Sequence, residues 1–552
     1  MRLLRVYIDG YRNLKNVEVN FDKDSLTTVV IGENGSGKSN LIEAIVEVFR
    51  AWDLREQRFI KFSYEIQYII RGKLVRIWGD KSAYHARVGD HGFYDVNIIG
   101  NPNKRGISLG ENFPDLIFGY YSGSSRRFES LFDDHQKSYY KDIIKEDGKV
   151  DFEKAQRDRR LFFCRPIHGT FALLSQFVFP TLSVEKELAK GLKITGFHSG
   201  LAHFKQPSWF NYDRWRREKS NDQKVGQRGR ASHADIVRYA DDHWLANGPA
   251  GECIANFREQ SFFPLMITGK VVDDYRRNPK EEGQLACFLR NSEALNGLRS
   301  AYKNDSELFA ALEAADISDL FREMIVWVTR TNDESGDISF SDLSDGERQL
   351  LMVLGLIRVS RGKEALFLLD EPDTHLNPAW QLTYLDLIRE WTEVATKGEE
   401  DKCQIIMTSH NPLTIAALTK KEVRVMSADE DGNISVRPPN IDPRGLGFSG
   451  VLTDIFGLPS SLDKPTQETI DRRNELAKKE ELSPALMKEF TKINDELRHL
   501  GFLYEERDKL YGEFLRQLDN VELADVDPLT PDEMRNREEA AREIVEKILK
   551  KQ

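Results

Sequence analysis

The stretch that decides the fold is Gly32-Glu33-Asn34-Gly35-Ser36-Gly37-Lys38-Ser39. It satisfies the pattern G-x-x-x-x-G-K-[ST], which is a Walker A phosphate-binding loop. Glycines let such a loop adopt positive φ angles and bring backbone N–H groups close to a phosphate. We expect Lys38 to bridge the β- and γ-phosphates of ATP and Ser39 to bind Mg²⁺ through its hydroxyl.

The segments on either side of this loop have the expected periodicities. Residues 26–31 form an apolar run typical of a buried strand, and residues 40–49 have the spacing of an amphipathic helix that begins at Asn40. The positive end of this helix adds to the phosphate site, so Asn40 belongs to the expected nucleotide-binding set. The sequence therefore predicts an α/β nucleotide-binding fold.

Composition sets the limits of the prediction. The chain has 552 residues, 40% of them hydrophobic and 31% charged, so it can bury a large core in two to four domains. No apolar run approaches the ~18 residues of a membrane span, and the N-terminus alternates like a strand instead of a signal peptide, which indicates a cytoplasmic protein. The net charge of -11 argues against general attraction to nucleic acid but allows a local basic groove. Four widely spaced cysteines give no metal-binding pattern, so the expected metal is the Mg²⁺ of a nucleotide.

Turn-forming residues and changes of periodicity along the chain predict four regions. Residues 1–121 are expected to form a lobe with an antiparallel sheet, 122–330 a mainly helical insertion, 331–440 a second α/β lobe, and 441–552 a helical region for partner binding or oligomerisation. The strands expected in the first lobe are residues 3–8, 16–21, 62–70, 73–78 and 83–88. The helices expected in the insertion lie near residues 151–160, 232–246 and 281–324.

Three further motifs have the chemistry of a nucleotide site. Residues 340–350 place Ser344 and Gly346 at a helix N-terminus, an anion site that an ordinary N-cap would also explain. An apolar strand ends in Asp370, expected to hold Mg²⁺, and Glu371, expected to activate water as a general base. A second strand leads to His410, where a side chain could sense the γ-phosphate.

These four elements, in this order, resemble the head of an ABC-type ATPase of the SMC, RecF and OLD-like branch. Residues 340–350 correspond to the signature loop of these heads, and the helix that follows is called the signature helix. In such heads the signature loop of one copy meets the nucleotide bound by another, so the resemblance implies a homodimer at minimum. Arg12 matches an arginine that these heads keep near the phosphates, although a surface turn residue is the alternative. Residues 115–122 lead into the expected Q-loop, yet they contain no glutamine.

The flanking sequence selects a branch of this family. The chain has neither the long heptads of SMC proteins nor the compact insertion of a transporter, and residues 371–378 are similar to the D-loop of OLD-like defence ATPases. Asp429 and Asp431 could suggest a Toprim nuclease, but they sit in an expected hairpin turn, so no intrinsic nuclease is expected. The chain most resembles the ATPases of Septu anti-phage systems, in their retron-associated form. That resemblance implies an HNH nuclease partner, PtuB, and a retron reverse transcriptase with its RNA-linked DNA. We expect ATP hydrolysis to be slow, because a switch needs a long-lived bound state more than turnover.

Two alternatives stay open: a RecF-like repair ATPase that binds DNA directly, and a self-sufficient OLD-family nuclease. The segment from Lys205 to Arg230 is basic and aromatic, which suits phosphate contact and base stacking, or else a loop whose aromatics pack on the body. Near the C-terminus an apolar stripe suits either docking of a partner or packing on the chain itself. Its members are Ala541, Ile544, Val545, Ile548 and Leu549.

Overall fold

The computed structural model describes two compact units, Met1–Phe456 and Gly457–Gln552. The described residues are 1–89, 92–97, 106–123, 125–143, 159–210, 243–272, 276, 278–331, 333–360, 363–395, 403–429, 431–458, 460, 462–477 and 483–500. The second unit begins later than the expected residue 441. The reason is that Val451 and Ile455 pack into the core of the first unit.

The first unit is built on a seven-stranded sheet with the strand order β18-β17-β3-β16-β15-β8-β9. Its strands are β3 (Thr27–Gly32), β8 (Leu116–Tyr121), β9 (Leu161–Phe163), β15 (Ala365–Asp370), β16 (Cys403–Thr408), β17 (Val423–Ala428) and β18 (Ile434–Arg437). All pairs are parallel except the hairpin of β17 and β18, whose turn had been predicted around Gly432. Every residue of β3 and β15 is buried, as expected for strands covered on both faces.

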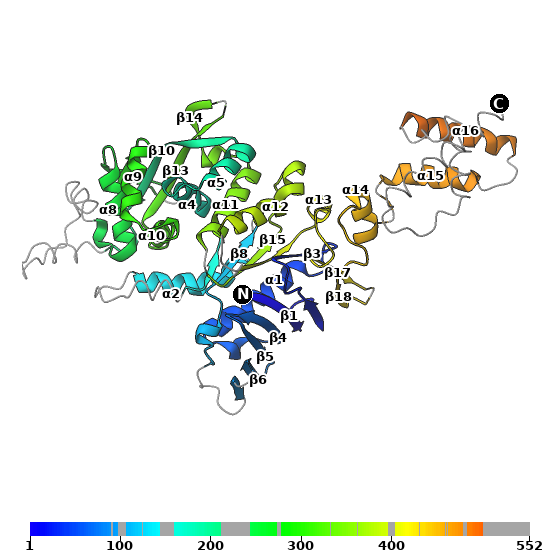
Figure 1. Cartoon of the computed structure of the whole chain (residues 1–552), viewed down its shortest axis with the longest axis horizontal. Coiled ribbons are helices and arrows are strands. Elements are labelled where there is room, and N and C mark those ends of the chain that lie inside the picture. The colour runs from blue at the N-terminus through cyan, green and yellow to red at the C-terminus, as the bar shows by residue number, and fades with distance from the viewer. Residues whose placement is uncertain are drawn as a thin grey trace, which may run out of the picture. The chain divides into compact units, whose positions relative to one another are not determined.

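Helices cover both faces of this sheet (Figure 1). The helices of the first unit are α1 (Lys38–Asp53), α2 (Asp133–Ile143), α4 (Pro166–Val178), α5 (Leu182–Glu187), α8 (Gly248–Gln260), α9 (Ser292–Ala301), α10 (Asp305–Ile317), α11 (Asp345–Val359), α12 (Pro378–Ala395), α13 (Pro412–Ile415) and α14 (Gly447–Gly450). Side chains of β15 alternate between two cores: Leu366 packs with α1, whereas Phe367 packs with α4, α11 and α12. The helix after the P-loop and the helix after the signature loop therefore lie on opposite faces.

A six-stranded antiparallel sheet packs with α1, which confirms the sheet predicted beside the nucleotide loop. Its order is β2-β1-β4-β5-β6-β7. The strands are β1 (Arg2–Asp9), β2 (Val17–Asn20), β4 (Ser63–Ile70), β5 (Lys73–Gly79), β6 (Ala83–Val88) and β7 (Gly92–Asn97). This sheet and α1 share one hydrophobic core with alternate residues of the seven-stranded sheet.

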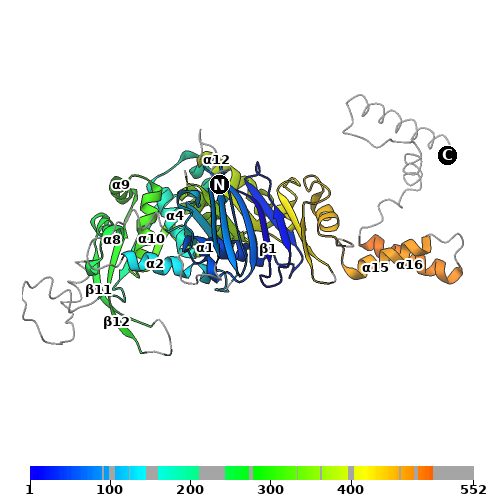
Figure 2. The ribbon, with the colours of Figure 1, turned by 90° about the horizontal axis from the view of Figure 1, so that it is seen from below.

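The insertion departs from the helical expectation, because it contains a five-stranded antiparallel sheet of order β11-β12-β10-β13-β14. Two of its strands, β11 and β12, are labelled in Figure 2. Its strands are β10 (Ile194–Lys205), β11 (Leu265–Val271), β12 (Lys280–Leu289), β13 (Phe321–Arg330) and β14 (Asp333–Ser339). Residues 281–289, expected to be helical, form most of β12, since Leu285, Cys287 and Leu289 are buried with a period of two. The helix expected near 151–160 and most of that near 232–246 lie outside the described residues.

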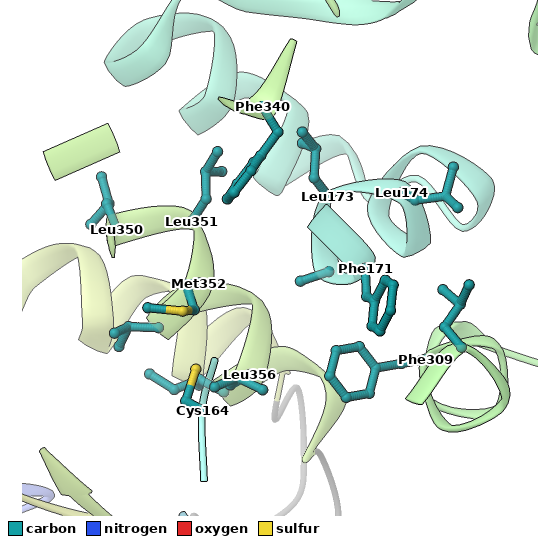
Figure 3. Close-up of a cluster of buried hydrophobic side chains, with 14 of the residues drawn as sticks. Cys164, Phe171, Leu173, Leu174, Phe309, Phe340, Leu350, Leu351, Met352 and Leu356 are labelled. Atoms are coloured by element: carbon teal, nitrogen blue, oxygen red, sulfur yellow. The ribbon is translucent and has the colours of Figure 1, made fainter. Parts of the chain in front are cut away.

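The insertion is fastened to the sheet by the packing of α4 against α10 and α11 (Figure 3). Phe171 of α4 and Phe309 of α10 have ring centroids 6.3 Å apart, nearly perpendicular to one another. A β-carbon added to Gly355 of α11 would lie 2.2 Å from the β-carbon of Ala172, so glycine permits the close helix crossing. The signature helix is therefore held in the same core as the insertion.

The second unit contains two helices that contact each other, α15 (Lys464–Ala477) and α16 (Pro484–His499). Leu476 and Leu497 are buried, and Arg472 Nε lies 2.8 Å from Glu489 Oε1. The apolar stripe expected from Ala541 to Leu549 lies outside the described residues. No helix within the described ranges is long and apolar enough to span a membrane.

Candidate nucleotide-binding site

The predicted P-loop connects the end of β3 to the start of α1. Gly32, Gly35 and Gly37 have φ angles of +154°, +85° and +97°, and a β-carbon on Gly32 would lie only 2.0 Å from the carbonyl oxygen of Met426. Side chains are excluded at Gly32 by this approach of β17 and disfavoured at Gly35 and Gly37 by the backbone conformation. The loop therefore has the geometry that the sequence predicted.

Lys38 lies inside the loop, with only 6% of its surface exposed. Its Nζ donates hydrogen bonds to the carbonyl oxygens of Gly32 at 2.8 Å and Glu33 at 3.0 Å. Burial lowers the pKa of Lys38, and the nearby carboxylates of Glu371 and Asp370 oppose this change. A second group in the loop, the buried Ser36 hydroxyl, has no hydrogen-bond partner among the described residues. The loop thus offers a cation and an unused hydroxyl to an anionic ligand.

The predicted metal-binding pair is brought together from opposite ends of the chain. Ser39 Oγ donates to Asp370 Oδ1 at 3.1 Å, and Thr408 Oγ1, on the neighbouring strand, donates to the same oxygen. Burial raises the pKa of Asp370, while these two hydrogen bonds oppose the rise. A hydroxyl and a carboxylate with this spacing are the oxygen ligands that Mg²⁺ prefers. The residues present fit the expected metal.

Glu371 and His410, the predicted base and sensor, are neighbours in space. His410 Nδ1 lies 3.2 Å from Glu371 Oε1, and 29% of the Glu371 side chain is exposed, so water can reach it. Glu371 has a φ angle of +53°, which is rare for a residue with a side chain. Its backbone N–H donates to Thr408 Oγ1 at 3.0 Å. Thr408 therefore positions both predicted acids, a role that the sequence analysis missed.

Asp373 is a second residue that the sequence did not reveal. It is 1% exposed and accepts hydrogen bonds from Ser409 Oγ and Thr414 Oγ1, both at 2.6 Å. These contacts tie the expected D-loop to the segment that carries His410. The only signal in the sequence was the position of an aspartate two residues after Glu371, which does not reveal its partners.

Arg12 lies beside the P-loop helix, as predicted. Its Nη1 lies 2.8 Å from Glu43 Oε2 and 3.2 Å from Asn40 Oδ1. Arg127, which the sequence analysis did not select, contacts the same two side chains from the segment after β8. Asn13 donates to the carbonyl oxygen of Gly35 at 3.0 Å. The turn after β1 thus supports the P-loop directly.

The signature residues are placed elsewhere. The Ser344 N–H donates to Glu347 Oε2 at 2.8 Å, and the Glu347 N–H donates to Ser344 Oγ at 3.3 Å, which forms a capping box at the start of α11. A β-carbon on Gly346 would lie 2.5 Å from the carbonyl oxygen of His375 in the D-loop. Because α11 and α1 lie on opposite faces of the sheet, Ser344 and Gly346 are not part of the cluster around Lys38.

Three other sequence interpretations can be placed. After β8, the N–H of Ser122 donates to the carbonyl oxygen of Asp370 at 3.3 Å, so a serine stands where a Q-loop glutamine was sought. Trp209 is partly buried and donates to the carbonyl oxygen of Ser318 at 2.7 Å, and Phe210 packs on the same core. These two aromatic side chains pack on the body of the protein, as the second interpretation of this segment expected. Residues 211–230 lie outside the described residues. Asp429 accepts hydrogen bonds from Asn433 in the hairpin turn.

Comparisons with known proteins agree with this geometry. A family model described as "AAA ATPase domain" matches residues 1–151, and one described as "AAA domain, putative AbiEii toxin, Type IV TA system" matches residues 204–416. Septu protein PtuA of Bacillus thuringiensis is 30% identical over 167 residues, which cover 26% of this chain and 39% of that protein. Septu protein PtuA of Bacillus mycoides (strain KBAB4) is 27% identical over 254 residues, which cover 43% of this chain and 33% of that protein. Over these segments the chain is similar to PtuA.

The similarity to PtuA is partial in length. The chain spans about two fifths and one third of the two PtuA relatives that it matches. A "Retron Vc95 probable ATPase" of Vibrio cholerae serotype O1 biovar El Tor is 24% identical over 127 residues, covering 21% of this chain and 23% of that protein. The chain is thus similar in part to these proteins and has an α/β P-loop fold, with its motifs in the predicted order.

Proposed function

We propose that this chain binds and hydrolyses ATP with Mg²⁺, dimerises around the nucleotide, and controls an associated nuclease in anti-phage defence. The observation that carries the proposal is the meeting of Ser39, Asp370, Glu371 and His410 at one edge of the sheet. These residues lie at the end of β15 or in the segments that follow β3, β15 and β16. Their chemistry matches metal binding, water activation and phosphate sensing.

Each residue has a distinct role in the proposed reaction. Bound Mg–ATP supplies the phosphoryl group and the metal that shields its charge. Lys38 exchanges its bonds to Gly32 and Glu33 for the phosphates, Ser39 and Asp370 hold the metal, and Glu371 accepts a proton from the attacking water. His410, beside Glu371, contacts the γ-phosphate and so links the nucleotide state to the chain around it.

The proposed dimer rests on the placement of the signature helix. Ser344 and Gly346 lie at the start of α11, where the positive end of a helix favours an anion, and α11 packs in a different core from α1. A second copy can present its own signature to this P-loop, and a symmetric pair would complete two sites. Hydrolysis is expected to be slow, because a switch depends on a long-lived bound state.

The proposed partners rest on similarity alone. The likeness to PtuA favours a Septu system with the HNH nuclease PtuB, and the likeness to a retron ATPase favours a reverse transcriptase with its RNA-linked DNA. A cytoplasmic, OLD-like ATPase without its own nuclease is consistent with these relatives. Contact of Lys205–Arg230 with nucleic acid is part of the same proposal.

The test is to purify the chain alone and together with the products of its neighbouring genes. We expect slow, Mg²⁺-dependent phosphate release, a dimer that forms with ATP, and a nuclease in the complex, measured by phosphate assay, native mass spectrometry and DNA cleavage. Rapid hydrolysis unaffected by any partner would contradict the switch. Salt-dependent duplex DNA binding by the chain alone would favour the RecF-like alternative, and Mg²⁺-dependent cleavage by the chain alone would favour the OLD-family nuclease.

A further inference from the structure

A cavity of about 520 Å³ lies on the signature-helix side of the first unit. It is enclosed by the end of β8 and the segment after it, the first residues of α4, the first two turns of α11, and His375 of the D-loop. This volume is in the range of sites that enclose a small organic ligand. The cavity is distinct from the cluster around Lys38, none of whose residues lines it.

Gln349 of α11 is the polar side chain that makes this cavity unusual. It is 3% exposed and lines the cavity. Neither its Oε1 nor its Nε2 forms a hydrogen bond of good geometry with any described residue. Its amide lies near Tyr120: burial raises the pKa of Tyr120, and a side-chain hydrogen-bond interaction with Gln349 opposes the rise. A buried amide whose hydrogen-bonding capacity is not fully satisfied costs stability unless a ligand satisfies it.

The rest of the lining supplies two other kinds of contact. Phe163, Phe340 and Tyr120 contribute aromatic surface, and Figure 3 shows Phe340 and Met352 in the cluster beside α11. Arg126 and Arg348 add guanidinium groups, which are 71% and 37% exposed and form ion pairs with Glu129 and Asp345. The N-terminal ends of α4 and α11 border the same space, and helix N-termini favour anions.

We infer that this cavity binds a nucleobase joined to a phosphate, at a site separate from the P-loop. The Gln349 amide can donate to and accept from the edge of a purine, aromatic rings can contact its face, and the arginines can bind the phosphate. The same chemistry is found in a free mononucleotide and in an unstacked nucleotide of a single strand. Since Asp345 and Arg348 flank Gly346, a ligand here would lie next to the proposed dimer contact.

The test uses the full chain carrying Lys38→Ala, which disables the P-loop. Binding of AMP, and separately of a short oligodeoxyadenylate, is measured by isothermal titration calorimetry. Gln349→Leu, which removes both polar atoms at similar volume, should weaken binding about tenfold or more. The matched control is Gln176→Leu, because Gln176 is also buried with an unbonded amide but does not line this cavity. Arg348→Gln should weaken binding through the phosphate and provides a second variant.

The outcomes separate the two sources of ligand. Binding of AMP that Gln349→Leu weakens and Gln176→Leu does not supports a mononucleotide site, and the same pattern with the oligonucleotide alone supports a nucleic-acid strand. Absence of binding for both probes, or equal binding in Gln349→Leu and the control, would overturn the inference. If Lys38→Ala does not fold, Asp370→Asn, which removes the charged metal ligand of the P-loop site, takes its place. Failure here leaves ATP hydrolysis at the P-loop unaffected, so the two proposals can fail separately.

Discussion

At the scale of single residues, the conformation of Glu371 is the most informative feature of the site. Its φ of +53° is unfavourable for a side-chain-bearing residue, and such conformations persist where surrounding contacts impose them. Here the contact is the hydrogen bond from its N–H to Thr408 Oγ1. The backbone turn directs the carboxylate toward His410 instead of continuing β15. The position of the Glu371 carboxylate, set by this backbone turn, suits the proposed role of this side chain in activating water.

Replacing Glu371 with glutamine should separate hydrolysis from binding. We expect Glu371→Gln to reduce phosphate release by about 10²-fold or more, because the amide cannot accept the proton, with nucleotide affinity little changed. Single-turnover hydrolysis and equilibrium binding of a fluorescent ATP analogue provide the measurements. Glu293→Gln, at an exposed position in α9, is the control and should leave both unchanged. Equal losses in the two variants would argue against a role as base.

Asp370 should make the ligand-free protein less stable than its asparagine variant. The folded pKa is raised by burial, so folding is favoured by protonation; this contribution is present below the unfolded pKa and lost as pH rises through the folded pKa. At neutral pH the carboxylate is therefore a cost, and Asp370→Asn, which keeps the acceptor oxygen, should raise the free energy of unfolding by roughly 1 kcal/mol. Urea denaturation at pH 7 without nucleotide measures the difference.

The same substitution should abolish stabilisation by Mg–ATP, because the metal loses a charged ligand. In the wild-type chain, Mg²⁺ affinity should fall on acidification at a higher pH than for an ordinary aspartate, since Asp370 must be ionised to bind it. Asp386→Asn, at an exposed position on α12, serves as the control. An unchanged response to Mg–ATP in Asp370→Asn would remove Asp370 from the metal site.

At the scale of elements, the helix crossing between α4 and α11 connects the insertion to the signature loop. Gly169 and Gly355 allow this crossing, since a β-carbon at either would lie within 2.4 Å of a neighbouring side chain. Phe171 fills the space between α4 and α10 (Figure 3). The position of Ser344 and Gly346 therefore depends on packing that the insertion supplies.

Truncation of this core should unfold the first unit more easily. Phe171 is fully buried, so Phe171→Ala is expected to cost roughly 3–5 kcal/mol of unfolding free energy through lost burial and a cavity. Phe262 is 68% exposed, and Phe262→Ala should change stability by less than about 0.5 kcal/mol. Chemical denaturation of the two variants gives a matched comparison. A small effect at Phe171 would show that the crossing is not a rigid core.

At the scale of the whole molecule, the P-loop helix and the signature helix of the first unit belong to different hydrophobic cores. The P-loop helix packs with the antiparallel sheet, and the signature helix packs with the insertion on the other face of the seven-stranded sheet. Ser344 and Gly346 are therefore not part of the cluster around Lys38 within one chain. This separation supports the proposed dimer, in which a second copy would supply the signature loop.

Complementation between inactive variants tests that arrangement. Lys38→Ala removes the P-loop of one copy and Ser344→Arg blocks the signature of another, so each homodimer should be inactive. Mixed dimers contain one intact composite site, and random mixing should restore about a quarter of wild-type hydrolysis. Phosphate release is measured across mixing ratios. The control is Lys38→Ala mixed with a Lys38→Ala, Ser344→Arg double variant, which should stay inactive because no dimer then contains an intact P-loop. No recovery in the mixture would contradict the composite site.

The sequence by itself determined the local features of this protein. Gly32 to Ser39 specified the P-loop, alternating residues specified the antiparallel sheet, and the apolar runs before Asp370 and His410 specified two buried strands. These predictions succeeded because turn geometry, strand periodicity and helix caps depend on neighbouring residues. The helix expected from residue 281 onward was wrong over residues 281–289, which form most of β12. Burial of alternate side chains in the tertiary structure decided for the strand there.

Only the tertiary structure decided which of these residues meet. Ser39 reaches Asp370 because β3, β16 and β15 pair in parallel, and that register also places Thr408 between the two acids. The roles of Asp373 and Arg127, the unbonded amide of Gln349 and the opposite placement of α1 and α11 have the same origin. Contacts between segments hundreds of residues apart are set by sheet order and packing, which no local pattern records.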